Sequence, residues 1–207
     1  MARKRDPKAS REAIEGAAAA LFAEQGYAGT STSQIAREAG VAEGTIFRHF
    51  KTKKALLLGV MAPMIRRFFA PIATRSLRAV LERRYDRLED FLETLWLDRV
   101  ELVRGHPHMV RILLQELSLQ PEVAAIVKDV FGEHVLPYFG AQLQWLRDDG
   151  LLDPTLADAV VLRHIITTIA SSLVLHSVYD LPLEGGLEEQ GRTVVRLLSG
   201  ALSPRAS

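Results

Sequence analysis

The chain of 207 residues contains no cysteine. This absence excludes disulfide bonds, thiolate zinc sites and cysteine nucleophiles, and it fits a reducing compartment. A long apolar run is missing as well. The longest uncharged stretch of the C-terminal half, residues 164–179, contains threonine, serine and histidine. It is shorter than the roughly 20 apolar residues that a membrane span needs. The basic N-terminus lacks the apolar stretch of a secretory signal. We therefore expect a soluble cytoplasmic protein without a membrane partner.

Recognisable catalytic motifs are also missing from the sequence. It has no Ser–His–Asp pattern, phosphate-binding glycine loop, HExxH motif or paired-acid pattern, and its six histidines are scattered. His106 and His108 could bind a metal, but they flank Pro107 and no carboxylates stand nearby at ligand spacing. We expect no enzyme, no cofactor and no metal site.

Charge is distributed unevenly along the chain, although the formal net charge is only +1. Residues 1–54 contain ten Lys and Arg against six Asp and Glu, whereas residues 55–207 contain sixteen against nineteen. A basic head on a mildly acidic body indicates that an anionic partner would bind the first quarter of the chain.

The hydrophobic pattern predicts helices throughout. Alternation with a period of two is absent, and Gly or Pro marks the breaks between helical stretches. Ser10 is a candidate N-cap for the first helix and Gly26 a candidate stop. Pro63, Pro71 and Pro137 should bend or break the helices that contain them. The expected helices span about 10–25, 32–39, 43–50, 53–80, 86–104, 107–119, 121–149, 154–178 and 187–200.

Two of these helices are short and are joined by a turn that contains Gly40. Two short helices with a small glycine turn are typical of the helix-turn-helix motif. We predict an all-α fold with an N-terminal three-helix DNA-binding domain over residues 1–52. A larger helical domain would span residues 53–207.

The segments "GYAGTSTSQIAREAGVAEGTIFRHF" and "KTKKALL" of residues 26–57 resemble the DNA-binding core of the tetracycline-repressor (TetR) family of bacterial transcriptional regulators. The likeness includes the turn glycine, the Gly-Thr pair in the second helix, the aromatic-x-His-Phe ending and the lysine three residues later. Beyond this first quarter, only the helical layout agrees with the family. The resemblance implies DNA-backbone contacts at Thr32, Thr45, Phe47, His49 and Lys53, and base-edge contacts at Ser33, Glu43, Gly44 and Arg48.

Physical chemistry is consistent with several of these roles. Gly44 lets the backbone approach DNA closely, and Thr45 offers a hydroxyl and a methyl group. Arg48 can bind a guanine or a phosphate through two N–H groups. Glu43 could accept from a cytosine amino group or stabilise the helix start through the helix dipole, and we favour the second role.

Three further positions in or near this segment are Phe47, Phe50 and the basic N-terminus. Phe47 stands where the family usually has tyrosine, so a phosphate hydrogen bond is lost. Phe50 is expected in the core. The N-terminal "RKRDPK" could enter a minor groove or remain a solubilising tail.

The larger half would hold a small apolar or amphipathic effector, as the family resemblance implies. Each of its apolar residues, taken alone, is more simply explained as core. As a set, however, one pocket between the helices of residues 86–149 is expected. The candidate lining residues are Phe91, Leu95, Trp96, Arg99, Arg111, Leu114, Gln115, Phe131, His134, Tyr138, His164 and Thr168. Asp98 and Arg99 are adjacent on a helix and are not expected to face each other.

Residues 154–178 and 187–200 are predicted to form a homodimer. The first of these helices is apolar or small around most of its surface, so it should be buried on all sides. Two helices from each subunit would make a four-helix interface. A dimer would bind a near-palindromic DNA operator. The favoured function is a DNA-binding regulator, usually a repressor in this family, that a ligand releases from DNA. The alternatives are an enzyme in the helical half and a DNA-binding adaptor that binds a protein partner.

Overall fold

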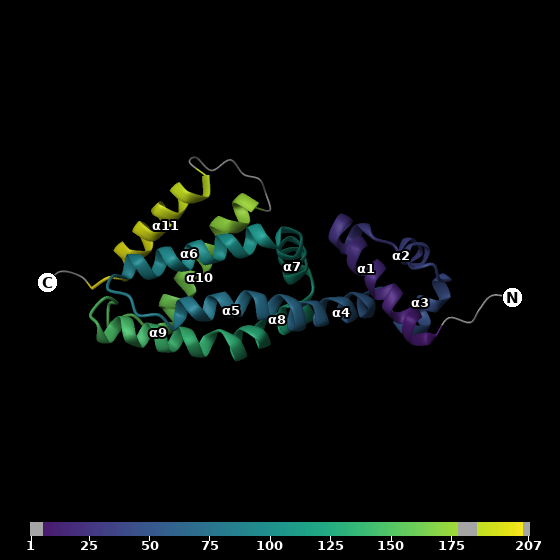
Figure 1. Ribbon diagram of the computed structural model, residues 1–207, viewed down its shortest axis with the longest axis horizontal. Coiled ribbons are helices and arrows are strands. Elements are labelled where there is room, and N and C mark those ends of the chain that lie inside the picture. The colour runs from purple at the N-terminus through teal and green to yellow at the C-terminus, as the bar shows by residue number, and fades with distance from the viewer. Residues whose placement is uncertain (1–5, 178–185, 205–207) are drawn as a thin grey trace. The chain divides into compact units, whose positions relative to one another are not determined.

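The computed structural model of the chain describes residues 6–177 and 186–204. Every regular element within these residues is helical and none is a strand, so the all-α prediction is confirmed (Figure 1). The elements are α1 (Pro7–Gly29), α2 (Thr32–Ala39), α3 (Glu43–His49), α4 (Lys53–Pro63), the π-helix η1 (Met64–Phe69), α5 (Ala70–Leu81), α6 (Leu88–Gly105), α7 (Pro107–Leu119), α8 (Pro121–His134), α9 (Leu136–Asp148), α10 (Asp158–Ser177) and α11 (Gly186–Leu202).

Packing divides the chain into two compact units. The first contains Met1–Ala70 and His108–Lys128, and the second contains Pro71–Pro107 and Asp129–Ser207. The first unit therefore combines the short N-terminal helices with α7 and the start of α8. A division by packing is not a division by function, so the functional boundary after residue 52 stays a prediction.

The first unit has its own core around α1, which packs on α2, α3 and α4. Ile14 and Phe22 of α1, Ile35 of α2 and Ile46 of α3 are all fully or almost fully buried. Burial of such side chains stabilises the unit by about 1.5–3 kcal/mol each. Short helices such as α2 and α3 are marginal alone, so this shared core holds them in place.

The start of α1 differs from the prediction that Ser10 caps it. The helix begins at Pro7, and the side chain of Asp6 accepts a hydrogen bond of 3.1 Å from the Lys8 amide. Proline is favoured in the first turn because it has no N–H to satisfy and its φ angle is already helical. Ser10 lies inside the helix and is buried. The predicted break at Gly26 is confirmed, since this residue has non-helical angles with φ 73°.

Proline also explains two further breaks. The helix expected over residues 53–80 changes to π-helical pairing directly after Pro63, which lacks the N–H of a regular helical hydrogen bond. The helix expected over 121–149 is two helices, α8 and α9. They meet at Val135, two residues before Pro137, because proline is accommodated in the first turn of α9.

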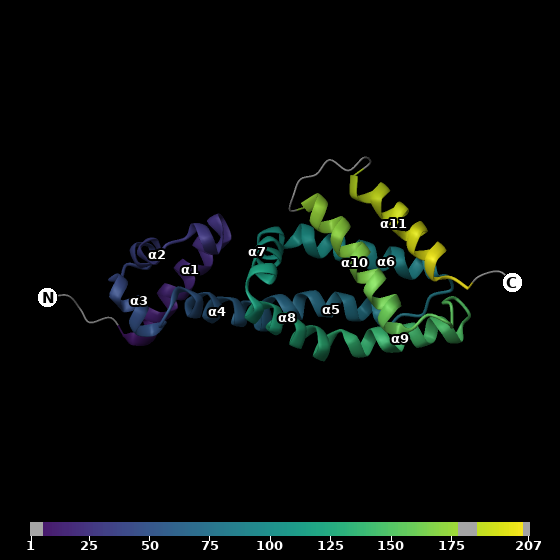
Figure 2. The same ribbon diagram turned by 180° about the vertical axis from the view of Figure 1, so that it is seen from behind.

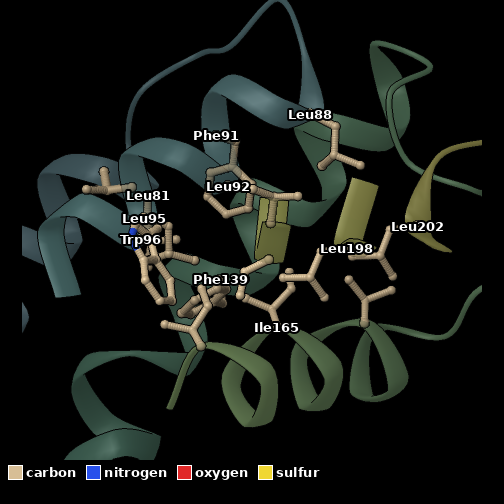
Figure 3. Close-up of a cluster of buried hydrophobic side chains, with 14 of the residues drawn as sticks. Leu81, Leu88, Phe91, Leu92, Leu95, Trp96, Phe139, Ile165, Leu198 and Leu202 are labelled. Carbon is tan, nitrogen blue, oxygen red and sulfur yellow. The ribbon is translucent and has the colours of Figure 1, made fainter. Parts of the chain in front are cut away.

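The second unit is built on contacts of α6 with α10 and α11. These three helices lie side by side in both views (Figures 1 and 2). Figure 3 shows the core of this unit, to which Leu95 and Trp96 of α6, Ile165 of α10 and Leu198 of α11 contribute. Trp96 is 2% exposed, and its indole N–H donates to the Leu187 carbonyl at 3.2 Å.

The prediction that α10 is buried on all sides does not hold within one chain. Val161, Ile165, Ile169 and Leu173 are buried, but the opposite face is exposed. That face combines the large apolar Leu175 with small and polar residues, namely Ala159, Arg163, His164, Thr167, Ala170 and Ser171.

Among the described residues, two helical segments are long and apolar enough to cross a membrane. They are Lys53–Leu81 and Asp158–His176. Core helices of soluble proteins meet the same criteria of length and composition, so this finding is weak evidence for a membrane span.

Candidate nucleic-acid interface

The turn between α2 and α3 is held by local hydrogen bonds. Ser31 and Gln34 form a reciprocal cap at the start of α2. The backbone amide of Gln34 donates to Ser31 Oγ at 3.2 Å, and the backbone amide of Ser31 donates to Gln34 Oε1 at 2.7 Å. Gly40 ends α2 with φ 63° and ψ 40°, and the Val41 amide then donates to the Ala36 carbonyl at 2.9 Å. A residue with a side chain would be strained at this φ angle, which explains the glycine.

The helices α2 and α3 expose five of the nine residues that the sequence predicted for DNA contact. Phe47 is 44% exposed, and Ser33, Glu43, Gly44 and Arg48 are exposed as well. The other four predicted DNA-binding residues are half-buried: Thr32, Thr45, His49 and Lys53.

Glu43 connects the two short helices. Its Oε1 accepts a hydrogen bond of 2.5 Å from Thr32 Oγ1, while Ala42 occupies the cap position of α3 and makes no side-chain cap. The carboxylate lies in the first turn of α3, where the helix dipole favours negative charge. Its observed hydrogen bond nevertheless goes to α2, so Glu43 also fixes the angle between the helices.

The end of α3 is anchored by aromatic packing. Phe50 is buried, as predicted, and the Arg11 guanidinium lies 4.8 Å from its ring centre. The His49 ring lies 6.5 Å from the Phe50 ring, and His49 Nε2 is buried with no hydrogen-bond partner in the described part of the chain. The predicted DNA-backbone contact of His49 would therefore involve a half-buried side chain whose Nε2 atom is covered.

Lys53, the first residue of α4, is fixed against Tyr27. Its Nζ donates to the Tyr27 carbonyl at 2.6 Å and lies 4.3 Å from the centre of the Tyr27 ring. The predicted phosphate contact would require this ammonium group to turn towards DNA.

Sequence reasoning missed Glu116 of α7, which acts on the same corner. Glu116 is 3% exposed, and its Oε2 has no hydrogen-bond partner among the described residues. Burial raises the pKa of Glu116, while hydrogen bonding to the Tyr27 backbone and the Gln120 side chain, and the charge of Lys53, oppose the rise. Burial likewise raises the pKa of Tyr27, and the Glu116 charge adds to this effect. The only signal in the sequence was Gly26, because the break at this residue disturbs the hydrogen bonding of the following amides.

The predicted effector residues lie in different surroundings. Phe91, Leu95 and Trp96 belong to the core of the second unit, and Phe131 and Tyr138 pack against that core. Leu114 and Thr168 are half-buried, whereas Arg111, His134 and His164 are exposed. The Gln115 side chain lies outside the described residues. Since Arg111, Leu114 and Gln115 belong to the first unit and the others to the second, a common pocket stays a prediction.

Arg99 pairs with Asp98, contrary to the prediction that the two side chains do not face each other. Arg99 Nε donates to Asp98 Oδ2 at 2.7 Å, although neighbours on a helix were not expected to face each other. The guanidinium also donates to the Ala73 carbonyl at 3.0 Å and lies 3.3 Å from Ser76 Oγ. These contacts to α5 turn the side chain back across Asp98. Burial lowers the pKa of Arg99 and the charge of Asp98 opposes this effect, so the ion pair offsets part of the desolvation cost.

A groove of about 450 Å³ between α6 and α11 was not predicted. Trp96 is the only predicted effector residue that lines it. The remaining residues that line the groove are Glu89, Glu93, Leu97, Glu188, Gly191, Arg192, Val195, Arg196 and Ser199. Several of these are charged residues on exposed helix faces, which sequence patterns do not distinguish from an ordinary surface.

The capped α2, the glycine turn and the exposed α3 define a helix-turn-helix protein. Residues 14–60 match the family model described as bacterial regulatory proteins, tetR family. This match confirms, for the N-terminal part of the chain, the resemblance to the family at residues 26–57.

Curated relatives match the same part of the chain. An HTH-type transcriptional regulator of Staphylococcus aureus (strain USA300) is 43% identical over 53 residues, which are 26% of this chain and 29% of the relative. Regulators from other strains of this species match equally, for example in strain COL. The chain thus spans less than a third of the length of these relatives, and the match says nothing of their remaining residues.

Solved structures match over nearly the whole chain. A TetR-family transcriptional regulator from Mesorhizobium loti MAFF303099 has a TM-score of 0.65 at 18% identity, covering 97% of this chain and 100% of that chain. The fatty acid degradation regulator FadR from Bacillus halodurans has a TM-score of 0.62 at 26% identity, covering 98% and 100%. FadR from Bacillus subtilis, solved with stearoyl-CoA, has a TM-score of 0.62 at 24% identity, covering 91% and 97%. These matches confirm the fold of the larger helical half.

Proposed function

We propose that the chain is a sequence-specific DNA-binding transcriptional regulator. The observation that carries the proposal is the exposed face of α3, where Phe47 and Arg48 project beside the side-chain-free Gly44. A Cβ atom at Gly44 would meet nothing within 4 Å, so packing inside the protein does not require glycine there. Close approach of a DNA backbone would require it.

Each exposed residue has a role in this proposal. The N-terminal part of α3 enters a major groove, which is about 12 Å wide. Arg48 reads a guanine edge or binds a phosphate, and Ser33, Glu43 and Gly44 approach the base edges. Thr32, Thr45, Phe47, His49 and Lys53 contact the sugar-phosphate backbone.

The larger half would bind an effector rather than catalyse a reaction. We propose that the protein is a repressor and that a small apolar or amphipathic molecule releases it from its operator. The solved structure of Bacillus subtilis FadR with stearoyl-CoA supports an amphipathic acyl compound as the first class to test. A coupling of about 1–3 kcal/mol would change DNA affinity roughly 5- to 150-fold.

The proposal includes a homodimer through residues 154–178 and 187–200, of which residue 178 lies outside the described residues. The exposed face of α10 has small residues at Ala170 and Ser171, which allow a second helix to approach closely. Leu197 of α11 is 62% exposed, although it is large and apolar. A dimer would place two α3 helices on a near-palindromic operator in the cytoplasm.

The test is a fluorescence anisotropy titration of the protein with the DNA that flanks its own coding region. Random DNA serves as control, and two salt concentrations are compared. We expect tight, salt-sensitive binding to the flanking DNA, and weakening when stearoyl-CoA is added. Equal weak binding to both DNAs, followed by failure to select any genomic fragment, would overturn the DNA-binding role. Unchanged binding with stearoyl-CoA would exclude this compound alone.

A further inference from the structure

Arg11 of α1 lies at the end of α3, although the sequence prediction of DNA contacts did not include it. Its guanidinium lies 4.8 Å from the centre of the Phe50 ring, and Phe50 is the residue that caps the end of α3. The start of α1 lies beside α3 in both views (Figures 1 and 2). Both helices belong to the first compact unit, so this arrangement does not depend on the placement of the second unit.

The contact places Arg11 close to the surface proposed to face DNA. The Phe50 amide donates to the Ile46 carbonyl at 2.7 Å, so Phe50 still belongs to the last turn of α3. Phe47, three residues earlier and 44% exposed, is a neighbour of Phe50 on the helix surface. Arg11 therefore lies at the border of the exposed face of α3.

The Phe50 ring is a fixed support for the guanidinium. The residue is 4% exposed, and a Cβ atom at Gly59 of α4 would lie 2.9 Å from its Cε1 atom. The ring is thus packed closely on the backbone of α4 and has little room to move. Because a guanidinium is attracted to an aromatic ring, Arg11 is positioned by a residue of α3 and not by α1 alone.

A second contact orients the guanidinium. Arg11 Nε donates to Glu15 Oε1 at 2.9 Å, one turn further along α1. The two terminal nitrogens make no hydrogen bond or ion pair within residues 6–177 and 186–204. The Arg11 side chain is 50% exposed, so these nitrogens are accessible to a partner. Paired terminal N–H groups are the donors with which arginine binds a phosphate at two points.

The charges around Arg11 favour an anionic partner. Arg48 and Lys51, on either side of His49 and Phe50 in the sequence, are both exposed. Glu15 opposes them, but its pair with Arg11 is partly exposed on both sides. Exposed pairs of this kind are weak, so a phosphate can compete with Glu15 for the guanidinium.

We propose that Arg11 is a DNA-binding residue whose terminal N–H groups donate to a phosphate next to the end of α3. Phe50 and Glu15 are positioning residues that hold the guanidinium in place in the free protein. The contact carries no sequence information, so it strengthens binding to every duplex. This inference rests on the proposed function and deepens it, because it adds α1 to the interface.

Substitution by glutamine separates charge from packing. Arg11→Gln keeps a long side chain beside Phe50 and an amide that can donate to Glu15, but it removes the charge. We expect affinity for operator and random duplexes to fall about tenfold. The slope of log affinity against log salt should decrease by about 0.9, as for the loss of one phosphate contact. Anisotropy titrations over a series of salt concentrations measure both quantities, and a purely structural role would leave the slope unchanged.

Arg67→Gln is the matched control. Arg67 is exposed in the same compact unit, but it follows Lys53 by 14 residues and lies in η1, beyond the end of α4. This separation is about 20 Å along the helix axis, or roughly two Debye lengths at 0.1 M salt. The same change of charge at Arg67 should alter affinity less than about twofold and leave the salt slope unchanged.

Chemical modification gives a second readout on the unaltered protein. Phenylglyoxal reacts with accessible arginines, and mass spectrometry of the digested protein reports the extent of reaction at each one. We expect a random duplex to protect Arg11 from the reagent and to leave Arg67 unprotected. An arginine that only packs on Phe50 would react equally with and without DNA.

Each result decides between these roles. An unchanged salt slope in a folded Arg11→Gln protein, equal losses of slope in Arg11→Gln and Arg67→Gln, or no protection of Arg11 by DNA would overturn the contact. If Arg11→Gln does not fold, the protection of Arg11 in the wild type decides. Failure of the wild type to prefer any operator would overturn the proposed function instead, because the contact of Arg11 is also measured on random duplex.

Discussion

Thr32 Oγ1 donates a hydrogen bond of 2.5 Å to Glu43 Oε1 and thereby connects the first turn of α2 with the first turn of α3. Both residues lie on the surface proposed to face DNA. A carboxylate near phosphates weakens binding, so its presence requires a compensating role. The bond to Thr32 supplies one, because it holds α3 at a defined angle to α2.

Substitution of Glu43 by Gln separates charge from geometry. The amide oxygen can still accept from Thr32, but the negative charge is gone. We expect binding to tighten about two- to fivefold at low salt, equally on operator and random duplexes, as measured by anisotropy. Thr32→Val, which keeps the acid and removes the donor, should weaken operator binding. A loss confined to the operator in Glu43→Gln would instead indicate that Glu43 reads a base.

Phe47→Tyr restores the hydroxyl that the family usually carries at this position. Phe47 is exposed, so the added hydroxyl is not buried in the free protein. One new hydrogen bond to a phosphate should tighten DNA binding by about 1 kcal/mol, or roughly fivefold, on any sequence. The thermal midpoint should not change, which differential scanning calorimetry can check. Unchanged affinity would show that the ring does not lie beside a phosphate.

Lys53→Ala should weaken binding to operator and random DNA alike. Loss of one phosphate contact lowers the slope of log affinity against log salt by about 0.9. The measurement is an anisotropy titration over a series of salt concentrations. Lys51→Ala, a change of the same charge at an exposed neighbouring residue, is the matched comparison. Equal slopes for wild type and Lys53→Ala would remove Lys53 from the interface.

Arg48→Ala should act on specificity rather than on general affinity. Loss of a two-point contact with guanine costs about 1–3 kcal/mol on the operator and much less on random DNA. The ratio of the two affinities is the quantity to measure, at one salt concentration. Equal losses on both duplexes would reassign Arg48 to the DNA backbone.

Local chemistry explains why the helix-turn-helix could be predicted so closely. The bounds of α2 agree with the sequence prediction and those of α3 differ by one residue, because Gly40 and the hydroxyl residues 30–33 are signals that lie inside the motif. Phe50 was also placed correctly in the core, since a large apolar residue at the end of a basic helix needs a partner.

The sequence predictions that failed concern mainly contacts between segments that lie far apart in the sequence. Asp98 and Arg99 pair because Ala73 and Ser76 of α5 turn the arginine back, and no pattern within α6 contains this information. The effect of the Tyr27 backbone on the pKa of Glu116 joins residues of α1 and α7 that lie still further apart in the sequence. Ser10 was misplaced for a local reason, because Asp6 and Pro7 compete for the same helix start and proline in the first turn is favoured.

Gly191 brings α11 against the indole of Trp96. A Cβ atom at this glycine would lie 2.4 Å from Trp96 Nε1 and 2.7 Å from Cδ1. The indole cannot move away easily, because it is buried and its N–H donates to the Leu187 carbonyl of the same helix. The glycine therefore allows α6 and α11 to pack closely and the tryptophan to keep its hydrogen bond.

Gly191→Ala should force α11 away from α6. Overpacking of this kind costs about 1–3 kcal/mol of the free energy of unfolding, and loss of the Trp96 hydrogen bond would add about 1 kcal/mol. Gly200→Ala on the same helix meets nothing within 4 Å and should be neutral or stabilising by up to about 1 kcal/mol, because alanine favours helix. Urea unfolding followed by tryptophan fluorescence measures both variants. Equal midpoints for Gly191→Ala and wild type would mean that α11 does not pack on Trp96 as closely as this geometry requires.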